Sequence, residues 1–79
     1  MTKNLELYNR IFMVNFRKTE EELPALKYRG FPAWDSVGHM DLIADLEERF
    51  DISMETTDML EFSSYEKGKE ILKKYGVEI

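Results

Sequence analysis

The residues of this chain that could do chemistry together lie in one short stretch around Ser36. Asp35 precedes this serine, and His39, the single histidine of the chain, follows three residues later. A hydroxyl, a carboxylate and an imidazole are the parts of an activated nucleophile. On a helix, however, Ser36 and His39 diverge by about 60° around the axis, and the chain has no Gly-x-Ser-x-Gly turn. We therefore expect no hydrolase, and we expect His39 to lie at the rim of a core.

The segment that begins at this serine, residues 36–50, predicts a helix with two different faces. At about 100° per residue, one side is an ordinary apolar core face. It carries Leu42, Ile43, Leu46 and Phe50. The other side carries a hydroxyl, small apolar residues and acids, namely Ser36, Val37, Met40, Asp41, Ala44, Glu47 and Glu48. Because a helix in a small domain needs only one apolar face for its core, the second side indicates a docking surface around a modifiable serine.

Charge is distributed unevenly along the chain, whose net charge is −5. Residues 35–62 contain nine acidic side chains and one basic side chain, a balance of −8, whereas the rest of the chain contains seven acids and ten bases, a balance of +3. An acidic half repels nucleic acid and anionic lipid, so we expect neither as a partner. It attracts proteins with basic patches and speeds their encounter.

The composition indicates one folded domain over residues 1–79, with 43% hydrophobic and 13% aromatic residues. There is no cysteine, and the aspartates are not spaced as in a calcium-binding loop, so we expect no disulfide and no metal site. No apolar run approaches the roughly 20 residues that span a bilayer, and the first residues lack the apolar run of a signal peptide. We therefore expect a cytoplasmic monomer.

Hydrophobic periodicity predicts four helices and no strands. The helices cover residues 3–17, 36–50, a short third segment at 56–61, and about 64–75. Met59 and Leu60 are expected to face inward from the third helix. The connection over 18–34 contains prolines and many apolar residues, and a capping box at 19–22 predicts a short helical turn. The predicted fold is an all-α four-helix bundle with three longer helices, a short third helix and a long loop between the first two.

Several of these residues resemble a known family. Asp35-Ser36-Val37 resembles the Asp-Ser-Leu motif of acyl carrier proteins, and residues 41–52 resemble the second helix of that family and the turn after it. The chain length, the long first loop and the fourth helix after Phe62-Ser63-Ser64-Tyr65 also fit. The resemblance spans essentially the whole chain and is strongest over residues 34–54. It implies an acyl-carrier-protein-like bundle in which Ser36 carries 4′-phosphopantetheine through a phosphodiester on Oγ. The thiol of this arm then holds a cargo as a thioester.

The resemblance also implies partners. The chain would not be an enzyme itself; a phosphopantetheinyl transferase would modify it, and acyl-transferring and acyl-modifying enzymes with basic docking patches would bind it. Their contact surface would consist of Asp35, Val37, Met40, Asp41, Ala44, Glu47 and Glu48. Such complexes should be weak and salt-sensitive, because a carrier must leave each enzyme in turn.

The chain departs from the usual family pattern at a few positions. Val37 stands where leucine is common, Gly38 costs about 1 kcal/mol in helix propensity, and Thr56 and Thr57 make the third helix less acidic. These departures favour polyketide or other specialised biosynthesis over housekeeping fatty acid synthesis. An aminoacyl or peptidyl carrier stays open, as does an unmodified acidic adaptor that binds partner proteins. A long apolar cargo is expected to fold back near Leu46, Leu60 and Ile71.

Overall fold

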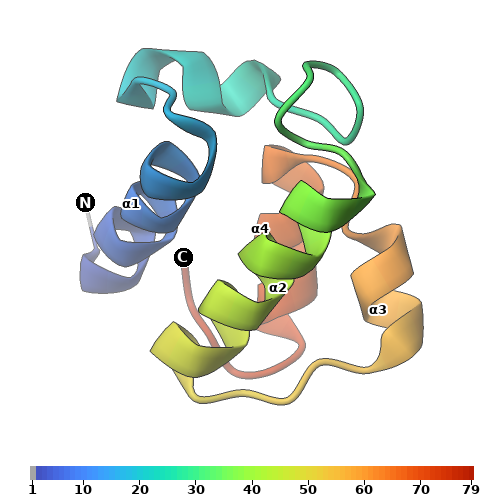
Figure 1. Ribbon diagram of the computed structural model, residues 1–79. Coiled ribbons are helices and arrows are strands. Elements are labelled where there is room, and N and C mark those ends of the chain that lie inside the picture. Colours follow the sequence, from blue (N-terminus) through green and yellow to red (C-terminus); the bar gives the residue numbers. More distant parts are fainter. Residues whose placement is uncertain (1) are drawn as a thin grey trace.

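The computed structural model describes residues 2–79 and has five helices there, four α-helices and one 3-10 helix (Figure 1). In chain order they are α1 (Lys3–Phe16), η1 (Glu20–Ala25), α2 (Ser36–Phe50), α3 (Thr56–Glu61) and α4 (Tyr65–Lys73). Residues 2–79 form no strand, and one isolated bridge joins Lys27 to Ser64. The predicted all-α fold is confirmed.

The predicted helix boundaries hold closely in the structure. The second and third helices begin and end at the predicted residues. The first helix ends one residue early, because Arg17 adopts a left-handed conformation with φ of 55°. The capping box at 19–22 forms and begins η1, with the Thr19 N–H donating to Glu22 Oε1 at 2.9 Å. The fourth helix is shorter than predicted and ends at Lys73, before the left-handed Gly76.

The helices pack around an aromatic core. Phe12 of α1 lies at its centre, and its ring centroid is 5.6 Å from that of Trp34 and 6.3 Å from that of Phe62. All three side chains are fully buried. From α2, Leu42, Ile43 and Leu46 are buried as predicted, and Phe50 is half-buried against them. In Figure 1, α4 lies behind α2, and η1 crosses near one end of α1.

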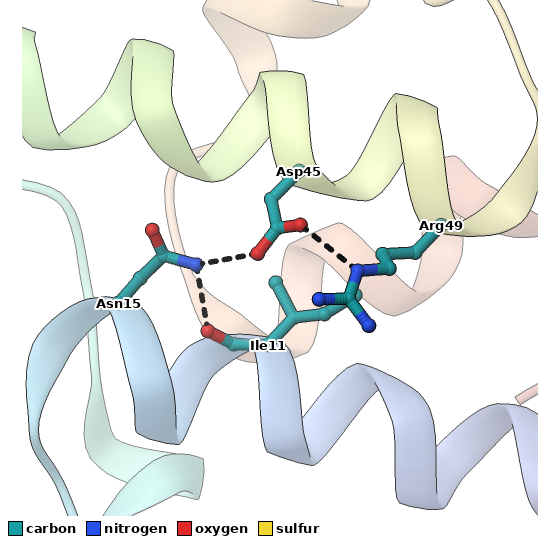
Figure 2. Close-up of polar contacts among 4 residues, drawn as sticks. All are labelled: Ile11, Asn15, Asp45 and Arg49. Carbon is teal, nitrogen blue, oxygen red and sulfur yellow. Dashed lines mark hydrogen bonds and ion pairs between the residues drawn. The ribbon is translucent and has the colours of Figure 1, made fainter.

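A polar contact joins α1 to α2 within this packing (Figure 2). Asn15 Nδ2 donates to the Ile11 carbonyl oxygen at 2.8 Å and to Asp45 Oδ2 at 3.0 Å. Arg49 Nε donates to the other oxygen of Asp45 at 3.3 Å. Asp45 is therefore directed at α1, and Arg49, from the same helix as Asp45, partly compensates its charge.

The predicted orientation of α3 is wrong at Leu60, whose side chain is 78% exposed. Asp58 is buried instead, with 4% exposure, and it accepts from Lys74 Nζ at 2.6 Å and from the Tyr75 hydroxyl. Asp58 and Leu60 are two residues apart, so a helix places them on nearly opposite sides. Burying the aspartate against the end of α4 therefore turns Leu60 outward, while Met59 packs partly against the core.

None of the helices within residues 2–79 is both long enough and apolar enough to cross a membrane.

Candidate functional site

Ser36 is the first residue of α2, and the residue before it caps the helix. Asp35 has an extended backbone, and its Oδ1 accepts from the Gly38 N–H at 2.8 Å. Its carbonyl oxygen accepts the first intrahelical bond, from the His39 N–H, also at 2.8 Å. These are the features of an N-cap. Ser36 is exposed and has no part in this capping bond, so its hydroxyl is available on the first turn.

A shallow hollow borders the serine on the side of the preceding loop. It is lined by Arg29, Phe31, Pro32, Trp34 and Asp35. The Arg29 guanidinium is a positive charge near the cap, and its pKa is raised, mainly by the side chain of Tyr28 and to a smaller extent by Asp35. A helix start offers unpaired backbone N–H groups and the positive end of the helix dipole. Together these features favour an anionic group on Ser36.

The loop before the serine is held by backbone hydrogen bonds. The Tyr28 N–H donates to the Ser63 carbonyl at 2.8 Å, and the Tyr65 N–H donates to the Leu26 carbonyl at 3.0 Å, so the loop is fastened to the start of α4. Within the loop, the Arg29 N–H donates to the Trp34 carbonyl at 2.9 Å. The loop that leads to Ser36 is therefore held in one conformation by these hydrogen bonds.

Gly38 has a packing role that explains why a glycine stands in the first turn. A Cβ at this position would lie 2.0 Å from the carbonyl oxygen of Ala33, which belongs to the loop. The loop backbone therefore passes directly against α2 at this point. The absence of a side chain at Gly38 permits this close approach, and it lowers the helix propensity of the first turn.

His39 lies half-buried at the rim of the core, as predicted, and uses both ring nitrogens in hydrogen bonds. Trp34 Nε1 lies 2.9 Å from Nδ1, and the carbonyl oxygen of Met59 in α3 lies 2.7 Å from Nε2. Because an indole N–H can only donate, Nδ1 accepts from Trp34, and the Nε2–H donates to the backbone carbonyl oxygen of Met59. Neither nitrogen is free to act as a base for Ser36.

The predicted docking surface is exposed along most of its length. Val37 is 68% exposed and Met40 is 55% exposed, so the loop covers neither side chain. Exposed side chains on the same helix are Ser36, Asp41, Ala44 and Glu48. Glu47 is half-buried, and its Oε2 accepts from the Met54 N–H at 2.8 Å. Of the acids predicted for this surface, Asp41 and Glu48 are thus the ones on α2 that point fully into solvent.

Within the part of the chain that the structure describes, no group of three histidine, cysteine or acidic side chains is placed to hold a metal ion. The acids of α2 are instead spread along the helix, with Asp45 and Glu47 in contacts of their own.

Two features of the site could not be predicted from local sequence signals. The hydrogen bond of His39 to Met59 joins residues 20 apart, and the Asp58–Lys74 pair joins residues 16 apart. The exposure of Leu60 follows from the second contact.

No protein-family model, curated protein or solved structure matches this chain. The function is therefore inferred from the residues and their geometry.

Proposed function

We propose that this chain is an acyl carrier protein that holds intermediates as thioesters on a 4′-phosphopantetheine arm attached to Ser36. The observation that carries the proposal is an exposed serine hydroxyl at the first position of a helix that another residue, Asp35, caps. Most serines at helix starts are caps, and their hydroxyls are occupied. Here the cap is a carboxylate, and the hydroxyl beside it is available for a covalent group.

The four-helix bundle of the acyl carrier type is part of this proposal. Three longer helices, the short α3 and an ordered connection before α2 support it. The hydrogen bonds from the loop to the start of α4 also give the serine a fixed orientation, which a modifying enzyme requires of its substrate.

Attachment of the arm would be a transfer of a phosphoryl-linked group from coenzyme A. Ser36 Oγ forms a bond to phosphorus while the pyrophosphate P–O bond breaks, and adenosine 3′,5′-bisphosphate leaves. The hydroxyl proton passes to a base on the transferase. In this chain, the start of α2 and Arg29 supply a positive environment for the resulting phosphodiester.

Partner enzymes would dock on the exposed side of α2. Val37 and Met40 would supply apolar contact, while Asp35, Asp41 and Glu48 would attract basic residues on the partner. Ala44 would allow close approach, and Glu47 would contribute less because its carboxylate is engaged with Met54. Val37, Thr56 and Thr57 favour a polyketide or other specialised pathway over housekeeping fatty acid synthesis.

Intact-mass measurement tests this function. The purified chain is incubated with coenzyme A and a broad-specificity phosphopantetheinyl transferase, and its mass is expected to rise by one phosphopantetheine group. Ser36→Ala should abolish the gain, whereas Ser53→Ala, at an exposed serine outside the helices, should retain it. A folded protein that gains no mass would contradict the carrier function and favour an unmodified acidic adaptor.

A further inference from the structure

A small hollow opens between α2, the end of α3 and the loop before α2. It has a volume of about 110 Å³ and is lined by Tyr28, His39, Leu60, Phe62 and Ser63. His39 lies three residues after Ser36, or about 4.5 Å along the helix axis. An arm attached to Ser36 begins close to this hollow, and the exposed Leu60 forms its outer edge.

The inner wall of the hollow is closed by His39 and by aromatic rings packed against it. The imidazole ring lies 5.2 Å from Tyr28, 6.2 Å from Trp34 and 6.3 Å from Phe62, centroid to centroid. Trp34 and Phe62 are fully buried and continue into the aromatic core. The space behind the histidine is therefore filled with side chains.

His39 is also fixed in this position by its two hydrogen bonds. If the imidazole swung outward, the indole N–H of the buried Trp34 would lose its acceptor, and the Met59 carbonyl would lose its donor. A buried donor without a partner is strongly unfavourable. The ring consequently acts as a fixed part of the wall and does not move aside easily.

The volume of the hollow limits what it can hold. An apolar cavity of about 150 Å³ holds one benzene molecule, so a hollow of about 110 Å³ holds only a smaller group. Tyr28, Leu60 and Phe62 give the hollow a largely apolar lining. An apolar group fits this lining better than a charged ammonium group, which would lose its hydration.

We infer that His39 plugs the space between α2 and α3, so that the protein shelters a short apolar acyl group and leaves longer chains in solvent. The inference rests on the proposed carrier function and assigns the cargo class of the same site. It replaces the sequence-based expectation that a long cargo folds back near Leu46, Leu60 and Ile71. Leu46 and Ile71 are buried in the packed core, whereas Leu60 is at the surface.

The inference can be tested with two forms of the protein that carry butyryl- or decanoyl-phosphopantetheine on Ser36. The methyl NMR spectrum of each is compared with that of the form that carries the arm without an acyl group. Leu60 lines the hollow, while Leu42 and Leu46 lie deeper, three and seven residues after His39 on α2. In the wild-type protein, butyryl is expected to shift the Leu60 methyl signals. Decanoyl is expected to leave the Leu42 and Leu46 signals unchanged. A decanoyl-induced shift at these core residues would overturn the inference, and this measurement does not depend on the folding of any variant.

His39→Ala then tests the plug itself. Removing the ring should admit the decanoyl chain, shift the Leu42 and Leu46 methyl signals and slow cleavage of the decanoyl thioester by hydroxylamine several-fold. Val14→Ala is the matched control, because it shortens an exposed apolar side chain on α1 that does not line the hollow, and it should change neither the core signals nor the cleavage rate. A folded His39→Ala protein with unchanged core signals would overturn the role of His39.

Loading separates the two proposals. A chain that accepts no phosphopantetheine would overturn the carrier function and this inference together. If the wild-type chain accepts the arm, and decanoyl then shifts the Leu42 or Leu46 methyl signals, only the inference about His39 is overturned and the carrier function stands.

Discussion

At the scale of single residues, the site depends on a division of roles between two neighbours. Asp35 satisfies the backbone of the first turn, and Ser36 keeps its hydroxyl exposed. The two side chains should therefore differ in their contributions to stability, although both stand at the same helix start.

We expect Asp35→Ala to lower the free energy of unfolding by about 1 kcal/mol, as loss of an N-cap does. Ser36→Ala should change it by no more than about 0.5 kcal/mol, as for other exposed positions. Urea denaturation of both variants measures the difference. Equal losses would mean that the serine shares the cap, contrary to the arrangement on which the carrier function rests.

Gly38→Ala should destabilise the protein even though alanine is the better helix former by about 1 kcal/mol. The new Cβ would lie 2.0 Å from the Ala33 carbonyl oxygen, so either the loop or the first turn of α2 must move. Overpacking of this kind costs about 1–3 kcal/mol. Denaturation by urea checks the sign, with Glu48→Ala as a control at an exposed position of the same helix. A more stable Gly38→Ala protein would show that the loop yields freely.

At the scale of elements, α3 is positioned by side chains from two other parts of the chain. His39 of α2 bonds to the carbonyl oxygen of Met59, and Lys74 and Tyr75 bond to Asp58. The helix is six residues long, and its N-cap, Glu55, makes no side-chain capping bond. Since a helix this short is unstable alone, these contacts are what hold α3 in place.

The Asp58 contact predicts a pH dependence of stability. The hydrogen bond from Lys74, and secondly that from Tyr75, lower the pKa of Asp58 below its ordinary value of 3.8. A lowered pKa in the folded state stabilises the protein above the unfolded-state pKa, and this contribution is lost as the pH falls through the folded-state value. The deprotonated Asp58 thus stabilises the fold fully at neutral pH and progressively less below about pH 4.

We expect Asp58→Asn to lower Tm at pH 7, and the difference from wild type to shrink as the pH is reduced toward 2. Thermal unfolding followed by circular dichroism over this range measures it. Glu61→Gln, an exposed acid at the end of the same helix, is the control and should show little difference at any pH. A gap between wild type and Asp58→Asn that stays constant with pH would contradict the role of the charged carboxylate.

At the scale of the whole molecule, the segregation of charge should govern encounters with partners. The segment 35–62 has a balance of −8, and it includes α2 with its exposed Asp41 and Glu48. Long-range attraction of this kind raises association rates and is screened by salt, since the Debye length is about 10 Å at 0.1 M.

For a transferase with a basic docking patch, kcat/KM should fall as salt is added, mainly through KM. Glu48→Lys should lower kcat/KM at low salt and flatten the salt dependence. Glu70→Lys makes the same charge change on α4, outside the acidic segment, and should have a smaller effect. Equal losses in the two variants would indicate a response to net charge and not to the α2 surface.

The positions of the helices could largely be predicted from the sequence, because their signals are local. Apolar periodicity gave the bounds of α2 and α3 and the buried face of Leu42, Ile43 and Leu46. It also placed Ser36 at a helix start, since Asp35 and the apolar positions after it lie within two helical turns. Such short-range patterns depend on the geometry of one helix and not on what packs against it.

The rotation of each helix about its axis, and the side chains that it contacts, depend on packing between elements and could not be predicted. Burial of Asp58 against the end of α4 turned Leu60 outward, and contacts with Trp34 and Met59 made His39 part of a wall. The need for a glycine at position 38 is explained only by the Ala33 carbonyl oxygen that packs against it. Contacts such as Asp58 with Lys74 and His39 with Met59 join residues far apart in the chain, and their energy outweighs local preference in a short helix. The hydrophobic periodicity of one helix carries no information about which distant residues its side chains will contact.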